Sequence, residues 1–165
     1  MCQLSGKLTE QKYQGSYELI AKIIEQYSSL PQMDKINYWQ QVVFSWIIGN
    51  TDMHLKNFSL YSPRTDYYVL SPTYDQVSTK IVMPEDTEEM ALSLNGFKKK
   101  LLVYDFREAM YSTDISEVVA NRILSDFSKF RDKWFACIDA SFISDDQKQN
   151  YKALIDSRLD VLAWE

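Results

Sequence analysis

The residues best suited to chemistry gather in a short polar segment, Gly49 to Asn57, that follows an apolar stretch. Its functional groups are the carboxylate of Asp52, the only histidine of the chain at His54, the amine of Lys56 and the amide of Asn57. Phosphoryl transfer needs a carboxylate that orients the attacking hydroxyl and accepts its proton, and an amide oxygen one loop-turn away that binds magnesium. The spacing Asp-x-x-x-x-Asn meets that need, so this segment is a candidate phosphoryl-transfer loop.

A second acid is placed to complete a magnesium site. Asp75 follows a predicted hairpin, which can fold it back beside Asn57. Magnesium takes one or two protein carboxylates or amides and fills its other positions with phosphate and water. We therefore predict that Asn57 and Asp75 bind Mg²⁺. Lys56 is expected to neutralise charge on the transferred phosphoryl group, and His54 to hold the loop or support the same charge.

Each of these residues also has a simpler alternative role. The spacing Asp-x-x-x-x-Asn often arises by chance, and loop Asp and Asn side chains more often satisfy backbone donors. A lone histidine such as His54 is more often a hydrogen-bonded structural residue, and it offers no zinc-type cluster. Asp75 could simply cap a turn. The ordered combination of loop, hairpin and second acid is what favours phosphoryl transfer over these separate alternatives.

Apolar periodicity predicts two helices ahead of the candidate loop. The first, over 16–29, begins with Ser16 as its N-cap. The second, over 34–49, ends at Gly49, which can adopt the left-handed conformation that closes a helix. Pro31 marks the break between them. The candidate loop therefore starts at the end of a helix.

Two hairpins are predicted after the loop. Residues 58–61 and 67–70 have the pattern of short strands, and turn-forming residues fill 62–66 between them. Residues 90–94 and 97–101 flank Asn95-Gly96, a pair that tolerates the positive φ of a tight turn. Asp75 lies between these two hairpins.

The C-terminal third is predicted to be helical. One helix runs over 116–140, and the next begins with a capping box made by Ser144 and Gln147. The apolar stripe of this last helix consists of Tyr151, Leu154, Ile155, Leu159 and Leu162. The predicted fold class is therefore mostly α with small β-hairpins (α+β), in a single domain over 1–165.

Composition limits the remaining classes of function. With 45% hydrophobic and 14% aromatic residues in 165, the chain can build a core, which argues against disorder. A net charge of -5 gives no basis for direct nucleic-acid binding, and the basic run Lys98 to Lys100 is interpreted as a solvated strand end. No apolar run is long enough to span a membrane, and Met1 to Gln14 has no signal-peptide pattern, so we expect a cytoplasmic protein.

The two cysteines are predicted to be unpaired thiols. Cys2 and Cys137 could form one bridge at most. Cys137 stands in a helical pattern of aromatic residues, where a reduced and buried thiol is the ordinary expectation.

Three segments together resemble a known family. Their sequences are KYQGSYELIA at 12–21, IGNTDMHLKNFSL at 48–60, and LSPTYD at 70–75 followed by Ser78-Thr79. They are similar to the C-terminal region of HipA-type kinases, and the similarity covers most of the chain. HipA proteins are toxin kinases of bacterial toxin–antitoxin modules that act beside a DNA-binding HipB antitoxin. The resemblance thus implies a protein-kinase-like C-lobe of HipA type, ATP as co-substrate and a serine or threonine hydroxyl of a protein substrate as acceptor.

The resemblance also implies roles for individual residues. Asp52 matches the catalytic aspartate, Asn57 the magnesium-binding asparagine, and Asp75 the metal-binding aspartate that corresponds to the one in the kinase DFG element. No glycine follows Asp75, as is usual for the HipA pattern. A HipB-like antitoxin is the implied partner.

One part of a complete kinase has no counterpart in this sequence. Kinases hold the ATP phosphates with a glycine-rich loop and a lysine from an N-terminal lobe. The four glycines here, Gly6, Gly15, Gly49 and Gly96, stand singly. We therefore expect that this chain lacks the nucleotide-clamping lobe, that it functions with an N-terminal lobe or a separate N-lobe subunit, and that an exposed apolar patch marks the docking surface.

Two alternative functions remain open. The chain could be a non-catalytic interaction module that binds a HipB-like antitoxin, although the presence of Asp52, Asn57 and Asp75 argues mildly against it. It could also be a magnesium-dependent phosphohydrolase that uses Asp52 and Asp75.

Overall fold

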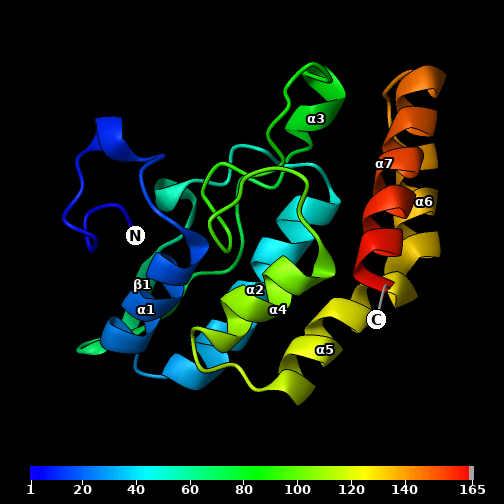
Figure 1. Cartoon of the computed structure of the whole chain (residues 1–165). Coiled ribbons are helices and arrows are strands. Elements are labelled where there is room, and N and C mark those ends of the chain that lie inside the picture. The colour runs from blue at the N-terminus through cyan, green and yellow to red at the C-terminus, as the bar shows by residue number, and fades with distance from the viewer. Residues whose placement is uncertain (164–165) are drawn as a thin grey trace.

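Helix α2 (Pro31–Ile47) runs through the middle of the computed structural model, which describes residues 1–163 (Figure 1). The elements that pack against it are α1 (Tyr17–Tyr27), α5 (Glu117–Asp126), α7 (Asp145–Ala163) and strand β2 (Tyr67–Leu70). Its buried side chains consequently point in several directions and include Trp39, Val42, Val43, Trp46 and Ile47. A helix that is buried on most sides forms the centre of the core.

The two helices ahead of the loop are confirmed, with one correction. Ser16 caps α1 as predicted, because its Oγ accepts a hydrogen bond from the backbone N–H of Leu19 at 3.2 Å. Helix α2 begins at Pro31, three residues earlier than predicted. A proline is favourable at the first helical position, since the N–H that it lacks would have no partner there. Pro31 therefore starts a helix rather than separating two.

The end of α2 has the geometry of a Schellman motif. Gly49 has a φ of +75°, and its N–H donates to the carbonyl of Trp46 at 3.0 Å. The N–H of Asn50 reaches back to the carbonyl of Ser45 at 2.9 Å. These two bonds satisfy carbonyls that would otherwise lack partners, and they fix the direction in which the chain leaves the helix.

The first predicted hairpin is present with a shifted first strand. Strands β1 (Leu60–Arg64) and β2 are antiparallel, with Leu60 opposite Leu70, and they form the one sheet of the described residues. Strand β1 was predicted over 58–61, but it extends through Pro63. A two-stranded sheet tolerates proline on its open edge, where the missing N–H removes no ladder bond.

The second predicted hairpin is wrong except for its turn. Asn95 and Gly96 have positive φ values of 48° and 85°, and Leu94 and Phe97 form an isolated bridge around them. No strand forms on either side of this turn, and the carboxylate of Glu89 accepts the backbone N–H of Lys100 at 2.7 Å. The run Lys98 to Lys100 is therefore a bend and not the end of a strand.

The predicted helix over 116–140 is broken. Helix α5 ends at Asp126, a 3₁₀ turn η3 (Phe127–Phe130) follows, and α6 (Arg131–Asp139) completes the stretch. Phe127 and Trp134 would lie about 10 Å apart along a straight helix. Their ring centroids are instead 6.2 Å apart, and both rings pack on Phe44, at 6.4 and 5.7 Å, so the break in the helix accompanies their convergence on one ring. Two further helices, α3 (Thr79–Val82) and α4 (Val103–Tyr111), were not predicted.

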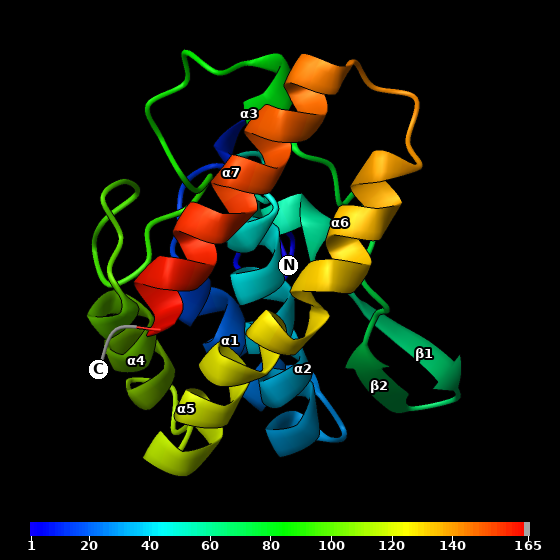
Figure 2. The same cartoon turned by 90° about the vertical axis from the view of Figure 1, so that its right-hand side faces the viewer.

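Helix α7 lies beside α6 and closes one side of the fold (Figure 2). The predicted capping box is confirmed, with Ser144 N donating to Gln147 Oε1 at 3.1 Å and Gln147 N donating to Ser144 Oγ at 3.3 Å. The buried stripe includes a charge that was not predicted, Arg158. Its guanidinium donates to Glu89 Oε2 at 2.9 Å, and the indole N–H of Trp46 donates to the same oxygen at 2.9 Å.

The cysteines are free, as predicted, but only one of them is buried. Cys2 lies in the core, whereas Cys137 is exposed, because α6 buries only the neighbouring Ile138. The expectation of a buried Cys137 is therefore wrong. Within the described residues, the longest helices are too polar or too short to cross a lipid bilayer.

Alanine at Gly49 should destabilise the fold more than alanine at Gly96. A Cβ on Gly49 would lie 2.6 Å from Leu154 Cδ2 and 2.9 Å from Lys80 Cβ, whereas one on Gly96 meets nothing within 4 Å. Both positions have positive φ, so the backbone strain is shared. We expect the free energy of unfolding to fall by roughly 3 kcal/mol for Gly49→Ala and about 1 kcal/mol for Gly96→Ala in urea denaturation. Equal losses would contradict the contact between Gly49 and α7.

Candidate functional site

The loop after α2 and the segment after β2 meet through Asn57 and Asp75. The loop ends in a 3₁₀ turn η2 (Leu55–Asn57). Asn57 Nδ2 donates to Asp75 Oδ2 at 2.5 Å, while Asn57 Oδ1 accepts the backbone N–H of His54 at 3.1 Å. The predicted proximity of Asn57 and Asp75 is thus confirmed, although their roles stay predictions.

A buried asparagine that sequence reasoning missed joins the two segments. The side chain of Asn50 accepts the backbone N–H of Asp52 at 3.1 Å and donates to the backbone carbonyl of Asp75 at 2.9 Å. Asn50 is 2% exposed, so both bonds are shielded from water. The first bond is an Asx-turn, which the Asn-x-Asp order of the sequence could have indicated. The second joins residues 25 apart and had no local signal.

Asp52 is held by a tyrosine from the N-terminal segment. The hydroxyl of Tyr13 donates to Asp52 Oδ1 at 2.6 Å, and this bond raises the pKa of Tyr13. Within residues 1–163, Asp52 Oδ2 has no hydrogen bond. The carboxylate is therefore fixed by one oxygen and free at the other. Tyr13 was not predicted as a site residue, since nothing local connects it to a residue 39 positions away.

His54 lies behind Asp52 and is 6% exposed. Its ring meets that of Tyr13 edge to face at 5.1 Å, and its backbone N–H donates to the carbonyl of Asp52 at 2.8 Å. Burial, followed by the nearby charge of Lys12, lowers the pKa of His54. A neutral imidazole favours the loop-holding role over support of negative charge.

Lys56 is exposed on the 3₁₀ turn. Its carbonyl accepts the hydroxyl of Tyr74 at 2.8 Å, which ties the turn to the residue before Asp75. The structure does not bring its ammonium to the other site residues, and within residues 1–163 that group forms no ion pair. Its predicted action on a phosphoryl group would use the free reach of the side chain.

The donor set at Asn57 and Asp75 fits magnesium. Asp75 Oδ1 has no hydrogen-bond partner within residues 1–163. The side-chain Oδ1 of Asn57 accepts the backbone N–H of His54 with one lone pair and keeps its second lone pair free. Both are hard oxygen ligands, and Mg²⁺ needs only one or two of them from a protein. In the described part of the chain, no three His, Cys, Asp or Glu side chains form a metal-binding group.

Asp75 has a backbone conformation that is unusual for a side chain. Its φ is 57°, in the left-handed region that aspartate and asparagine tolerate better than most residues. The bond from Asn50 to its carbonyl holds this conformation. The turn therefore aims the Asp75 carboxylate back at Asn57.

Sequence comparison relates this chain to kinase-family proteins. It matches the family described as HipA-like C-terminal domain over residues 1–134. It is 31% identical over 137 residues to "Putative kinase Y4dM" of Sinorhizobium fredii, covering 81% of this chain and 33% of that protein. A "Putative kinase" of Haemophilus influenzae is 36% identical over 63 residues, which is 38% of this chain and 18% of that protein. The chain thus spans a third or less of the length of these relatives.

A solved structure has the same fold. HipA of Shewanella oneidensis MR-1, determined in a complex with HipB and its operator DNA, superposes with a TM-score of 0.83 at 17% identity. The superposition covers 96% of this chain and 42% of that chain. The predicted mostly helical α+β fold of HipA type is therefore confirmed.

The folded protein should lose stability as His54 becomes protonated in the unfolded state. The pKa of His54 in the folded protein is lowered from its usual 6.5. Just below pH 6.5, the imidazole is therefore protonated more readily in the unfolded chain than in the folded one. The free energy of unfolding should consequently fall as the pH drops from about 6.5 towards the folded pKa. The pKa itself can be read from the NMR titration of the only histidine, with His54→Gln as the control for the stability slope. A folded-state pKa at or above 6.5 would contradict the burial of the ring.

Proposed function

This chain belongs to the family of HipA-like C-terminal domains, and from that premise we propose that it is the catalytic half of a serine/threonine kinase of a bacterial toxin–antitoxin system. It transfers the γ-phosphoryl group of ATP to a protein hydroxyl. The observation that carries the proposal is the contact of Asn57 with Asp75, joined through Asn50 to the segment of Asp52. The side chains of Asp52, Asn57 and Asp75 are the acid, the amide and the second acid that phosphoryl transfer uses.

Asp52 acts as the group that receives the substrate hydroxyl. Tyr13 occupies Oδ1, so the acceptor hydroxyl donates its hydrogen bond to Oδ2. Fixing one carboxylate oxygen leaves the other in a defined position, which favours a single orientation of the attacking oxygen. His54 supports this arrangement by holding the backbone of Asp52 in place.

Asn57 and Asp75 would hold Mg²⁺. The bound ion would supply positive charge at the phosphate oxygens. Lys56, exposed on the turn that carries Asn57, would add positive charge through its long, mobile side chain. The hydrogen bond between Asn57 and Asp75 keeps the two ligand side chains together in the absence of the ion.

The phosphates of ATP are clamped by a second lobe, in the same polypeptide or in a separate subunit. The four glycines of the chain stand singly, so they form no glycine-rich loop. Two tyrosines that contact the site loop, Tyr13 and Tyr74, are 45% and 39% exposed. Exposed aromatic side chains at a polar site suit a surface that another lobe covers.

A HipB-like antitoxin is the proposed regulatory partner. Binding of such an antitoxin by a non-catalytic module is the second candidate function. The Shewanella HipA structure contains HipB, which favours binding of a related protein here. A non-catalytic module would bind that protein equally well after alanine replaced Asp52, Asn57 and Asp75. A kinase would lose phosphoryl transfer in the same variant.

Loss of the Asp52 carboxylate should remove phosphoryl transfer. In the presence of the nucleotide-clamping lobe, we expect Asp52→Asn to slow transfer of labelled γ-phosphate to protein by at least about 100-fold, because general base catalysis is lost while the shape of the side chain is kept. Activity that survived in both Asp52→Asn and Asp75→Asn would overturn the proposal. Release of phosphate from p-nitrophenyl phosphate by the chain alone would favour a phosphohydrolase.

Divalent ion binding can be tested on the chain alone with paramagnetic Mn²⁺ in place of Mg²⁺. Substoichiometric Mn²⁺ should broaden the NMR signals around Asn57 and Asp75 selectively. Asp75→Asn should abolish the effect, because the amide lacks the charge that attracts the ion. Asp66→Asn is the matched control, since Asp66 also has a positive φ, 56°, but lies in the hairpin turn. Broadening that persists in Asp75→Asn would place the ion elsewhere.

A further inference from the structure

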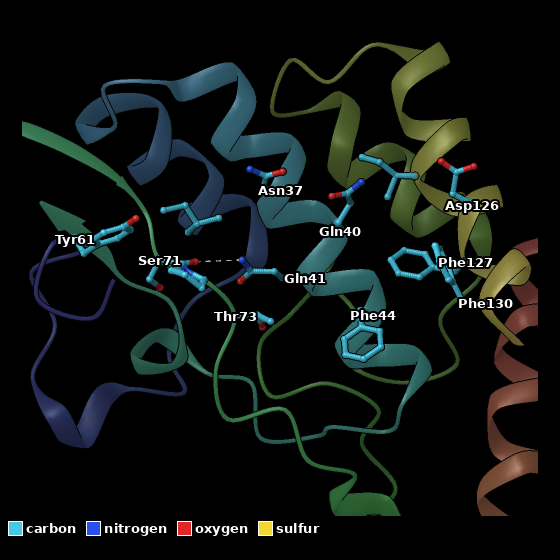
Figure 3. Close-up of a pocket in the computed structure, with 13 residues that line it drawn as sticks. Asn37, Gln40, Gln41, Phe44, Tyr61, Ser71, Thr73, Asp126, Phe127 and Phe130 are labelled. Carbon is cyan, nitrogen blue, oxygen red and sulfur yellow. Dashed lines mark hydrogen bonds between the residues drawn. The ribbon is translucent and has the colours of Figure 1, made fainter. Parts of the chain in front are cut away.

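A groove of about 660 Å³ lies beside the candidate site, and none of the predicted site residues lines it. Figure 3 shows α2 between its two walls, with Tyr61 and Ser71 on one side and Phe127 and Phe130 on the other. The first wall comes from the hairpin and the segment that follows it. The second comes from α5 and the 3₁₀ turn η3. The groove is therefore bounded by elements that are far apart in the sequence.

The floor of the groove carries a row of amide side chains. Asn37, Gln40 and Gln41 are three and four residues apart on α2, so they share one face of the helix (Figure 3). Gln41 donates to the carbonyl of Ser71 at 3.4 Å, and within residues 1–163 the amides of Asn37 and Gln40 have no hydrogen-bond partner. Each amide offers two donors and one acceptor. The amides of the floor can therefore form further hydrogen bonds, both with N–H donors and with C=O acceptors of a bound molecule.

The spacing of these amides suits an extended polypeptide. Four residues along a helix advance about 6 Å, and groups on the same side of an extended chain repeat at about 7 Å. The main chain of such a peptide presents N–H and C=O groups in alternation, which is what side-chain amides can pair with.

The far wall supplies a place for one large apolar side chain. Phe130 is 44% exposed and stacks on Trp134, with ring centroids 6.2 Å apart. Phe44 and Phe127 lie next to it, half-buried and in contact with each other. Aromatic rings that are fixed by packing but open on one face are suitable anchors for an aliphatic or aromatic group.

The charges at this end exclude a basic occupant. Asp126 is the only charged residue that lines the groove. Its carboxylate is already paired with Lys129 and, at 3.5 Å, with Arg122, and these cations hold its pKa below the usual range. Lys133 also lies over the ring of Phe130, at 5.9 Å, so cations outnumber the one carboxylate here and favour a neutral or mildly acidic segment over an Arg- or Lys-rich one.

The opposite rim leads directly to the candidate metal ligand. Thr73 lines the groove and precedes Asp75 by two residues, which span at most about 7 Å. A peptide in the groove would therefore lie next to the phosphoryl-transfer site.

We propose that this groove binds an extended, neutral to mildly acidic segment of the protein that is phosphorylated, with a large apolar side chain against Phe130. The identity of the bound protein as the substrate rests on the proposed kinase function. The binding of the segment does not, because it needs neither nucleotide nor metal. The groove thereby raises the local concentration of the acceptor hydroxyl near Asp52.

Peptide binding can be measured without ATP. The probes are fluorescein-labelled pools of peptides about eleven residues long, with a fixed central Leu, Asp or Arg and random neutral flanks, and the readout is fluorescence anisotropy. The Leu pool should bind best. The double variant Asn37→Ala with Gln40→Ala should weaken it by about tenfold, because two hydrogen bonds are lost. Gln32→Ala, another exposed glutamine of α2 that does not line the groove, is the matched control.

The apolar anchor has its own variant and control. Phe130→Ala should remove the preference for Leu over Asp, whereas Phe142→Ala, at an aromatic residue that is fully exposed away from the groove, should not. Failure of every pool to bind, unchanged affinity in the double variant, or preference for the Arg pool would overturn the proposal. Peptide binding without any phosphoryl transfer would support the groove and overturn the kinase function separately.

Discussion

The buried amide of Asn50 is the interaction on which the candidate site depends. Its two hydrogen bonds join the loop of Asp52 to the turn of Asp75, and the amide of Asn50 is itself buried, so it depends on these two partners. An unsatisfied buried polar group costs about 1–3 kcal/mol, so the paired arrangement is strongly preferred over an open one. The Schellman motif at the end of α2 places Asn50 where it can make both bonds.

Local signals in the sequence were sufficient for most of the loop and its supports. Gly49 indicated the end of a helix, Ser16 and the pair Ser144 and Gln147 indicated helix starts, and the order of loop, hairpin and acid indicated that Asp75 returns to Asn57. Each of these inferences depends on residues within a few positions of one another, or on a hairpin whose length fixes where its ends meet. Local chemistry determines such features, whatever the rest of the chain does.

Features set by distant contacts could not be read in the same way. At the break over 127–130, Phe127 and Trp134 converge on the ring of Phe44, and beside the turn at Asn95-Gly96 the carboxylate of Glu89 accepts a backbone N–H that a strand would have used. Apolar periodicity alone predicts a straight helix over 116–140, and two strands beside the Asn95-Gly96 turn. The bond from Tyr13 to Asp52 is of the same kind, since it joins residues that only the folded chain brings together. Tertiary contacts overrode local preference in each case.

The ion pair between Arg158 and Glu89 affects where the domain can be shortened. The family match ends at residue 134, yet Arg158 of α7 lies over the ring of Trp46 at 4.3 Å and satisfies Glu89, which also binds the indole N–H of Trp46. Removing one partner of a buried ion pair costs roughly 3–5 kcal/mol, because the other charge is left without compensation. A truncation at the family boundary would therefore expose the central helix and leave the carboxylate of Glu89 beside it without its cation. For expression or for grafting onto another lobe, a shortened domain should therefore keep the last helix.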